Sequence, residues 1–379
     1  MANDKLKDLF KGKDYPEDAF YLEKNLGRRT IILYGAGESA HWFVEVVIKG
    51  YGFTPYIVLD RRFTEESTFE GIPAIHPDHF LATSQQLDES IIVISSGNQK
   101  TACEIEQELN LKGFKHIISL HNIYEIHNPF SQPVELFDDG FSYYLNRESD
   151  IKAAYNLLAD EESQQVFLAF LETHMKRKPV DIPRRPREEQ YFPSDVLLNK
   201  GYSRFVSCGA YDGDTIRALI QKNGRVEEIV CFEADPILFK RLSNYLADNK
   251  NEIADKVLAL PCAVYSHEDI VCFTEATGLG SRISENGNLK VQTVSLDKIL
   301  PTFSPTMITM DIEGVELEAL QGAEQIIRTH KPDLAICVYH SPNQIWDIPM
   351  YLDSLDLGYK FYLRNYTSFS LETVLYATV

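Results

Sequence analysis

The fold is decided by a stretch in the second half of the chain, Arg204-Phe205-Val206-Ser207-Cys208-Gly209-Ala210-Tyr211-Asp212-Gly213-Asp214-Thr215. Its first five residues have the pattern of a buried strand, and its glycines form a turn that opens a helix. An earlier stretch repeats this order: an apolar segment at residues 30–34 is followed by Gly35-Ala36-Gly37-Glu38-Ser39-Ala40. Strands that alternate with helices are typical of parallel sheets, so we predict two α/β units.

The second unit is predicted to contain seven strands, at residues 204–208, 229–233, 257–261, 307–311, 333–339, 359–364 and 373–377. Helical patterns occur at residues 215–222, 237–249, 315–328 and 344–355. Only a short segment separates the last two strands, whereas a parallel crossover needs about a dozen residues or more. We therefore expect a mostly parallel, doubly wound sheet in which one strand is antiparallel.

Length and patterning predict three segments in the chain. With 379 residues the chain has room for two domains. The glycine turns and the change of pattern between them place a small Rossmann-like α/β domain at residues 1–125. A helical connector is expected at residues 126–189, and the larger domain is expected at residues 190–379.

Composition narrows the class of protein. The chain has 37 Lys and Arg against 56 Asp and Glu, a net charge of −19, which makes long nucleic acids unsuitable partners because their affinity depends on neutralising phosphates. No apolar run is long enough to span a membrane, and the polar first residues have no secretory signal pattern. The six cysteines lack zinc-site spacing and several lie in apolar runs. We therefore expect a cytoplasmic protein.

The second glycine turn indicates the charge of its ligand. Ligands of doubly wound sheets bind at the carboxyl ends of the strands, where small residues let the backbone approach them. Asp212 and Asp214 would repel a pyrophosphate. A cation without phosphate suits the turn better, and S-adenosylmethionine, with its sulfonium and amine, is such a ligand. Glu233, at the end of the next strand, is placed to accept hydrogen bonds from ribose hydroxyls.

Small residues after the second and third strands would flank the adenine. The predicted cofactor-binding residues of this unit are Gly209, Ala210, Tyr211, Asp212, Asp214, Glu233, Ala234 and Ala263. The fourth strand ends at Asp311-Ile312-Glu313-Gly314 and the fifth ends at Tyr339-His340. Because neighbouring parallel strands end at one edge of the sheet, Asp311, Glu313 and His340 are expected to converge beside the cofactor.

These residues resemble the FkbM family of S-adenosylmethionine-dependent methyltransferases. The resemblance covers about half the chain, from residue 190 onward. Its motifs are residues 205–215, Phe232-Glu233-Ala234-Asp235-Pro236, Asp311-Ile312-Glu313-Gly314 with Glu316, Leu320-Gln321-Gly322-Ala323, and Tyr339-His340-Ser341-Pro342. The segments Glu189-Gln190-Tyr191-Phe192 and Leu375-Tyr376-Ala377 also fit it. One departure is Ser207, where the family usually has Asp.

The resemblance implies a class I methyltransferase fold and O-methylation of a sugar, glycan precursor or similar small-molecule hydroxyl. The hydroxyl must lose its proton, and His340, with an ordinary pKa of about 6.5, suits the general base. Asp311 would orient His340 or itself be the base. Alternatively, Asp311, Glu313 and His340 could hold a divalent metal ion that lowers the pKa of the acceptor.

The first glycine turn meets the context of a dinucleotide fingerprint, since it follows a strand and opens a helix. Gly35, Gly37 and Asp60, which ends the next strand, are the candidate nucleotide contacts. The unit resembles the small Rossmann-like domain at the front of sugar acetyltransferases and other glycan-modifying enzymes. It would bind a nucleotide or serve as a docking or dimerising module, and a homodimer is one expected assembly.

Two other functions stay open at this point. The first is an NAD-dependent sugar-modifying oxidoreductase or epimerase built on the first glycine turn. Against it stand the missing second mononucleotide half and the absence of a Tyr-x-x-x-Lys pair after that turn. The second is a non-catalytic, cofactor-binding module in glycan assembly, for which Ser207 is a point in favour.

Overall fold

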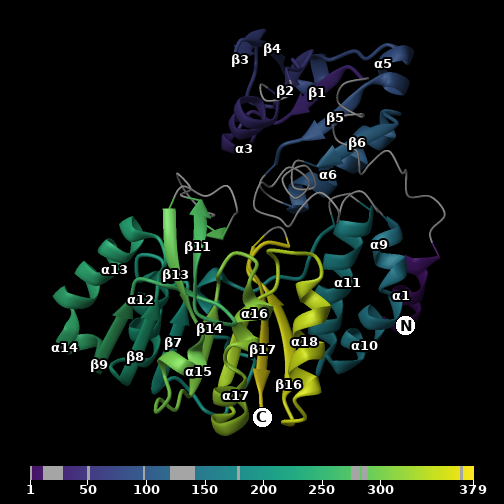
Figure 1. The fold of residues 1–379 in the computed structure, drawn as a ribbon. Coiled ribbons are helices and arrows are strands. Elements are labelled where there is room, and N and C mark those ends of the chain that lie inside the picture. The colour runs from purple at the N-terminus through teal and green to yellow at the C-terminus, as the bar shows by residue number, and fades with distance from the viewer. Residues whose placement is uncertain are drawn as a thin grey trace. The chain divides into compact units, whose positions relative to one another are not determined.

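The computed structural model describes residues 2–11, 29–48, 52–96, 99–119, 141–176, 180–274, 282–283, 289–367 and 370–379. The chain forms two compact units (Figure 1). One comprises Met1–Glu148, Gln165–Pro183 and Ser368–Ser370, and the other comprises Ser149–Gln164, Arg184–Thr367 and Leu371–Val379. The predicted boundaries near residues 125 and 189 stay predictions, and part of the predicted connector lies outside the described residues.

The first unit contains a six-stranded sheet in the order β3-β4-β2-β1-β5-β6. Its strands are β1 (Ile31–Tyr34), β2 (Ile57–Leu59), β3 (Ser67–Phe69), β4 (Ile72–Ile75), β5 (Ile91–Ile94) and β6 (His116–Ser119). All neighbouring pairs are parallel except the β3–β4 hairpin, which the sequence pattern did not predict. Alternate residues of β1 enter separate apolar clusters, so both faces of the sheet are buried, as parallel sheets require.

Several helices are assigned to this unit. They are α1 (Ala2–Phe10), α3 (Glu38–Trp42), α5 (Ser84–Glu89), α6 (Gln99–Leu111) and α9 (Phe141–Asn146). The helix expected after the first glycine turn is α-helical only over α3 and continues as a π-helix at Phe43–Ile48. Helices α10 (Glu148–Leu157) and α11 (Glu161–Lys176) follow in the chain.

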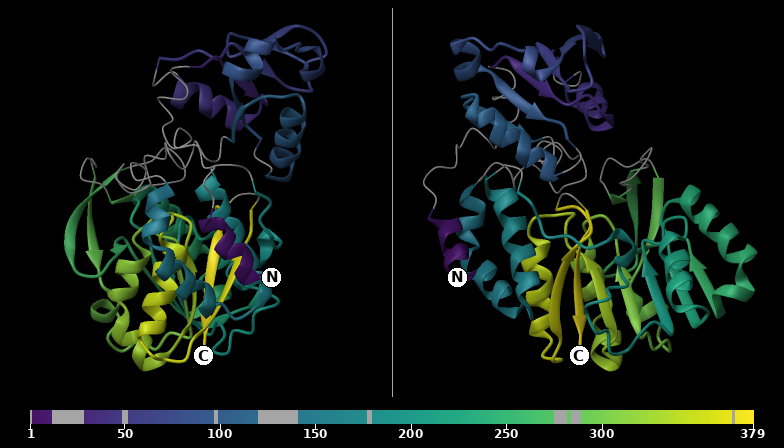
Figure 2. Two further views of the ribbon diagram at one scale, coloured as in Figure 1. Left: turned by 90° about the vertical axis from the view of Figure 1, so that its right-hand side faces the viewer. Right: turned by 180° about the vertical axis from the view of Figure 1, so that it is seen from behind.

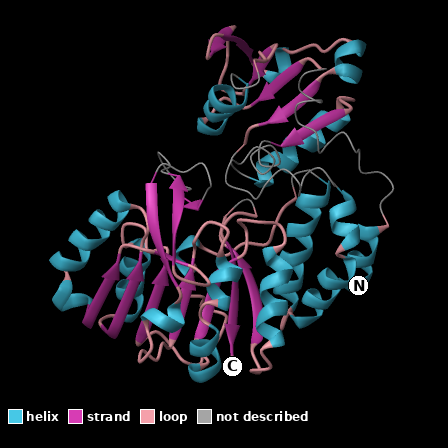
Figure 3. Cartoon of the chain, in the orientation of Figure 1, coloured by secondary structure: helices cyan, strands magenta, loops and turns pink. Residues whose placement is uncertain are grey.

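The second unit contains the predicted seven-stranded sheet, in the order β16-β17-β15-β14-β7-β8-β9 (Figure 3). The strands are β7 (Arg204–Cys208), β8 (Val226–Phe232), β9 (Ala254–Leu260), β14 (Met307–Met310), β15 (Asp333–Cys337), β16 (Lys360–Asn365) and β17 (Thr373–Thr378). Only β17 runs antiparallel to its neighbours, so the predicted hairpin of the last two strands is confirmed.

Both faces of this sheet are buried. Phe205, Ile229, Met307 and Ala335 pack in one cluster with residues of α12 (Asp214–Asn223) and α13 (Pro236–Asp248). The residues that alternate with them, such as Val206 and Ile308, are also buried. This double burial explains why the strands read as continuous apolar runs.

The other elements of this unit include α14 (Lys250–Ile253), α15 (Leu296–Ile299) and α18 (Gln344–Ser354). The predicted helix at 315–328 is two helices, α16 (Glu316–Gln321) and α17 (Glu324–His330). Gly322, between them, packs so tightly that an added Cβ would lie 2.2 Å from the Tyr265 carbonyl oxygen. Figure 2 shows these helices from two further sides.

A second, four-stranded sheet in this unit has the order β10-β13-β11-β12. Its strands are β10 (Ala263–Val264), β11 (Asp269–Thr274), β12 (Arg282–Ile283) and β13 (Leu289–Val294). It follows β9 directly, so Ala263 lies where the chain leaves the large sheet.

The six cysteines are free thiols: Cys208, Cys231, Cys262 and Cys337 are buried, whereas Cys103 and Cys272 are half-buried. Among the described helices, none combines the length and the apolar character needed to cross a bilayer.

Candidate active site

The turn after β7 is built on a close backbone contact. Gly209 has φ +77°, and a Cβ at this position would lie only 1.9 Å from the carbonyl oxygen of Asp311. The N–H groups of Gly209 and Ala210 both donate to the carbonyl oxygen of Phe232, at 3.0 and 2.9 Å. Only glycine permits this approach. The turn is therefore locked to the ends of both β8 and β14.

Glu233 lies where β8 ends and is only 7% exposed. One carboxylate oxygen accepts the Tyr211 N–H and the other accepts the Asp235 N–H, each at 2.8 Å. Burial raises the pKa of Glu233 to about 7, although these backbone donors oppose the shift. Each oxygen keeps acceptor capacity, so the group can take further hydrogen bonds from a ligand.

The other predicted cofactor contacts lie around this turn. The Asp212 carboxylate forms an ion pair with Arg217. Asp214 is exposed in the first turn of α12, where its carboxylate accepts the Thr215 N–H at 2.7 Å. Ala234 and Ala263 are half-buried. Asp212 and Asp214 thus have local structural partners, and cofactor contact by these four residues stays a prediction.

Asp311, Glu313 and His340 lie close together, as predicted. Asp311 and Glu313 follow β14, which Figure 1 labels beside β7, and His340 follows β15. The His340 Nε2 atom lies 3.3 Å from Asp311 Oδ1 and 3.7 Å from Glu313 Oε2. The His340 side chain is 7% exposed, whereas those of Asp311 and Glu313 are each 31% exposed. The two carboxylates can therefore meet a ligand while the imidazole lies behind them.

The imidazole has a third acidic neighbour, Glu316, which was not among the predicted site residues. His340 Nδ1 lies 2.8 Å from Glu316 Oε1, and the Glu316 side chain is fully buried. Burial alone would lower the pKa of His340, but the carboxylates of Glu316, Asp311 and Glu313 raise it well above its ordinary value. An imidazolium has no lone pair to accept a proton, so this charge state does not favour His340 as the general base.

The two exposed carboxylates are in different states. Burial tends to raise the pKa of Asp311, but His340, Tyr191 and Tyr339 lower it below its ordinary value. Burial raises the pKa of Glu313 to about 7, because His340 offsets only part of that effect. A carboxylate that exchanges its proton near neutral pH has the properties of a general base, whereas Asp311 stays ionised.

Two tyrosines contact Asp311 and were not predicted as site residues. The Tyr191 hydroxyl donates to Asp311 Oδ2 at 2.9 Å, and the Tyr339 hydroxyl donates to Asp311 Oδ1 at 3.3 Å. The Tyr191 N–H in turn donates to the Tyr376 hydroxyl at 3.0 Å. Tyr191, Tyr339 and Tyr376 all lie in segments that carried the family resemblance, which was the available signal for them.

Glu372 adds another carboxyl group near Asp311. It precedes β17, accepts a hydrogen bond of 2.5 Å from the Gln190 side chain and lies 3.8 Å from Arg187. Burial and the charge of Asp311 raise the pKa of Glu372. The site therefore has more acidic groups than the sequence pattern indicated, and His340 is the cation at its centre.

The metal alternative finds no support. Within the residues that the structure describes, no group of three or more His, Cys, Asp or Glu side chains is arranged to hold a metal ion.

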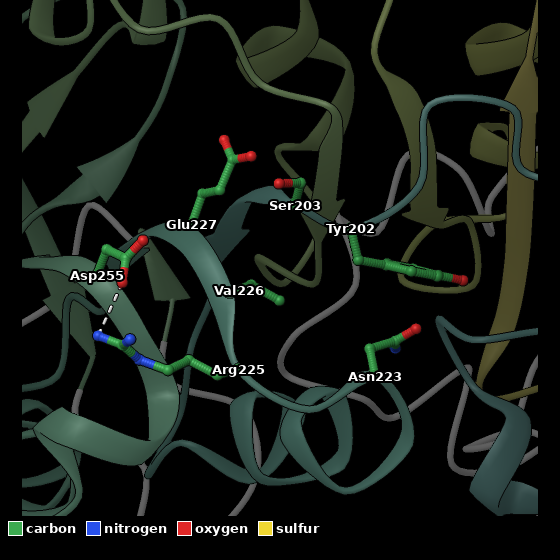
Figure 4. Close-up of a pocket in the computed structure, with 7 residues that line it drawn as sticks. All are labelled: Tyr202, Ser203, Asn223, Arg225, Val226, Glu227 and Asp255. Carbon is green, nitrogen blue, oxygen red and sulfur yellow. Dashed lines mark ion pairs between the residues drawn. The ribbon is translucent and has the colours of Figure 1, made fainter.

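A pocket of about 490 Å³ lies elsewhere in this unit, at the amino ends of β7, β8 and β9 (Figure 4). It is lined by Tyr202, Ser203, Asn223, Arg225, Val226, Glu227 and Asp255. An ion pair of 2.8 Å joins Arg225 and Asp255 at its rim. It shares no residue with the cluster at the carboxyl ends of the strands.

The first glycine turn has a different acidic partner. Asp60 Oδ2 accepts the Ala36 N–H at 2.8 Å, and the guanidinium of Arg62 donates to both Asp60 oxygens at 3.0 and 3.1 Å. Burial tends to raise the pKa of Asp60, but the Arg62 hydrogen bonds lower it below its ordinary value. Gly35 has φ +110°, whereas Gly37 caps α3 with an ordinary backbone. Nucleotide contact by Gly35, Gly37 and Asp60 stays a prediction.

Comparison with known proteins identifies the second unit. Residues 207–361 match the family model described as the methyltransferase FkbM domain. No curated protein shows significant similarity to the chain.

Among solved structures, the methyltransferase FkbM from Methylobacillus flagellatus KT is 23% identical, with a TM-score of 0.72 and 99% of each chain covered. Fibrillarin from Aeropyrum pernix is 10% identical, with a TM-score of 0.33 over 50% of this chain and 72% of its own. An rRNA methylase from Streptococcus thermophilus is 15% identical, with a TM-score of 0.30 over 51% of this chain and 95% of its own. The sheet order and the similarity to the Methylobacillus flagellatus structure confirm the mixed α/β fold with its Rossmann-like seven-stranded sheet, and residues 207–361 are similar to the methyltransferase FkbM domain.

Proposed function

We propose that the chain is an S-adenosylmethionine-dependent methyltransferase that acts on a hydroxyl of a sugar, glycan precursor or similar small molecule. The observation that carries the proposal is the convergence of Asp311, Glu313 and His340 beside the Gly209 turn, next to a buried carboxylate at Glu233. The methyltransferase domain identity supports the reaction class.

The residues of the turn fit the proposed cofactor. Glu233 is a buried carboxylate with spare acceptor sites, which matches the two hydroxyls of a ribose. The carboxylates around the turn suit a cationic ligand without phosphate. Arg217 is already paired with Asp212, so it is not available to bind a phosphate. Glu233, the Gly209 backbone and the alanines would hold the nucleoside. The bound cofactor supplies a methyl group on a cationic sulfur.

The acid cluster fits the acceptor chemistry. Glu313 is exposed on one side and its pKa is about 7, so it can take the proton of an acceptor hydroxyl at neutral pH. Asp311, held by two tyrosine hydroxyls, would orient the acceptor through hydrogen bonds. His340 keeps these two carboxylates close together because its charge offsets their repulsion.

The test has two stages. Isothermal titration of the full chain with S-adenosylhomocysteine should show binding, and the absence of heat across a range of temperatures would contradict the proposal. A panel of sugars, nucleotide sugars and amines is then incubated with methyl-labelled cofactor. Label transfer to a hydroxyl is expected, whereas transfer only to amines would overturn the proposed acceptor.

For the first unit the proposals are a nucleotide at the Gly35 turn, a docking role and a homodimer. Titration with nucleotides and measurement of the mass in solution check them. The NAD-dependent alternative has the first glycine turn in its favour, but the Asp60 carboxylate that would meet a ribose is engaged by Arg62.

A further inference from the structure

Glu316 is a buried carboxylate with four partners. It lies at the start of α16 and its side chain is fully shielded from solvent. Its Oε1 accepts the Ile312 N–H at 3.0 Å and its Oε2 accepts the Gly314 N–H at 3.1 Å. Its other neighbours are His340 Nδ1 at 2.8 Å and the side-chain amide of Gln344, which donates to Oε2.

The two backbone contacts fix the turn that presents the acid cluster. Glu313 and Gly314 both have left-handed backbone conformations, with φ +59° and +107°. A non-glycine residue adopts this conformation only where its surroundings impose it. The Glu316 carboxylate bridges the N–H groups on either side of Glu313. It therefore holds the conformation that directs the Glu313 side chain toward His340.

The third contact sets the environment of the imidazole. The groups that face His340 are Glu316 on α16, Asp311 and Glu313 after β14, and Glu372 before β17. The nearest of these is Glu316, and because it is fully buried its charge is not screened by water. Asp311 and Glu313, by contrast, are partly exposed.

We propose that Glu316 is a positioning residue of this site, which fixes the 311–314 turn and holds the His340 ring between Asp311 and Glu313. The inference rests on the proposed function for its catalytic meaning, but its structural content concerns only this chain. Glu316 touches neither the cofactor turn nor an exposed surface, so it acts through Glu313 and His340. His340 in turn acts on the two carboxylates, which then differ in proton affinity.

The first measurement needs no substrate. The ring nitrogens of His340 are followed by NMR in the full chain with labelled histidine, assigned with His340→Gln. In the wild type we expect an imidazolium that persists well above the ordinary histidine pKa of about 6.5. In Glu316→Gln, which keeps the shape but removes the charge, we expect the midpoint to fall by at least one pH unit. A wild-type midpoint at or below 6.5 would overturn the inference even if the variant did not fold.

The second measurement separates a positioning role from a merely structural one. The pH profile of kcat is measured at saturating cofactor. In Glu316→Gln its acid limb should move to higher pH by about one unit, because a weaker positive charge on His340 lowers the pKa of Glu313 less. Gln344→Met is the matched control, since it removes the amide contact to Glu316 without removing a charge. It should lower stability slightly and leave the midpoint of the limb in place. Equal profiles in Glu316→Gln and the wild type would contradict the inference.

The two proposals fail in different ways. If S-adenosylhomocysteine does not bind but the pKa of His340 lies well above 6.5 and falls in Glu316→Gln, the positioning role stands and the proposed function fails. If the cofactor binds and methyl transfer occurs but His340 titrates normally, the function stands and the role of Glu316 fails.

Discussion

The two glycine turns of this chain have the same local plan but differ in the state of their acidic residue. In both, an acidic side chain after the second strand accepts an N–H of the turn: Asp60 accepts from Ala36 and Glu233 accepts from Tyr211, each at 2.8 Å. Asp60 also holds the guanidinium of Arg62, and its pKa is lowered. Glu233 is bonded by backbone N–H groups, and its pKa is raised to about 7.

This comparison shows that a glycine motif followed by one acidic residue does not by itself define a cofactor site. A carboxylate that is already neutralised by arginine accepts further hydrogen bonds from a ribose hydroxyl only weakly. A buried carboxylate without a cation gains from each added donor. On this ground we place the methyl-transfer chemistry in the second unit, and the following predictions test that assignment.

The largest effect is expected for Glu313→Gln. The variant loses the proposed base, so kcat for methyl transfer should fall about 10²–10⁴-fold. The dissociation constant of S-adenosylhomocysteine should stay unchanged, because Glu313 lies in the acid cluster rather than at Glu233. Asp60→Asn in the first unit is the matched control and should leave kcat as in the wild type. A similar loss of kcat in both variants would contradict the assignment of methyl transfer to the second unit.

Next in size is the effect of adding a methyl group at each turn. Gly209→Ala places its Cβ against the Asp311 carbonyl, whereas Gly35→Ala meets only the Ser95 hydroxyl, which can rotate. Left-handed backbone costs both variants about 1–2 kcal/mol, and Gly209→Ala should lose about 1–3 kcal/mol more from overpacking. Chemical denaturation of both variants measures the difference. Equal stabilities would show that the second turn is not the more tightly packed one.

Removal of the two acidic residues should separate the turns in binding. Glu233→Ala should weaken S-adenosylhomocysteine binding by about 1.5–3 kcal/mol, the range for a hydrogen bond to a charged group. Asp60→Ala should leave this affinity unchanged. Titration calorimetry at pH 8 compares the two. Loss of affinity in Asp60→Ala alone would move the cofactor to the first unit.

A smaller effect is expected from pH. Glu233 accepts hydrogen bonds best when ionised, so cofactor affinity should rise as the pH increases through about 7. The folding contribution of Glu233 has the opposite sign. Its pKa is raised from 4.5, so between pH 4.5 and about 7 the folded state retains a proton and stability falls as the pH rises. In Glu233→Gln both trends near pH 7 should weaken, and a wild type without them would contradict the assigned pKa.

The smallest effect is expected for Gly37→Ala. Gly37 has a negative φ, and no atom lies within 4 Å of the place that an added Cβ would occupy. The unfolding midpoint should therefore change by less than that of Gly35→Ala. A large loss of stability here would show that the first turn is more constrained than its contacts indicate.

Much of the fold could be predicted from the sequence because its signals are local. The strand that ends at Cys208 and the turn at Gly209 are indicated by a pattern of consecutive residues. The hairpin of β16 and β17 followed from the short segment that connects the two strands. The convergence of Asp311 and His340 followed from the rule that parallel strands end at one edge. The β3–β4 hairpin was missed because its strands are only three and four residues long.

The rest depended on contacts that no local pattern carries. Tyr191 and Asp311 are separated by 120 residues, and Gln190 and Glu372 by 182. The pKa of His340 is raised by Glu316, Asp311 and Glu313, and the motif that contains these residues does not show how close they lie to the imidazole ring. A residue type supplies an ordinary pKa, but its neighbours in space decide the actual one.

The contact between Gly209 and the carbonyl oxygen of Asp311 has a consequence for how this domain can diversify. Because main-chain atoms meet there, exchanging side chains cannot change the spacing between the Gly209 turn and the turn that carries Asp311. If the proposed function is correct, a change of acceptor would have to come from the surrounding loops, because the distance between the proposed donor and acceptor sites would stay fixed.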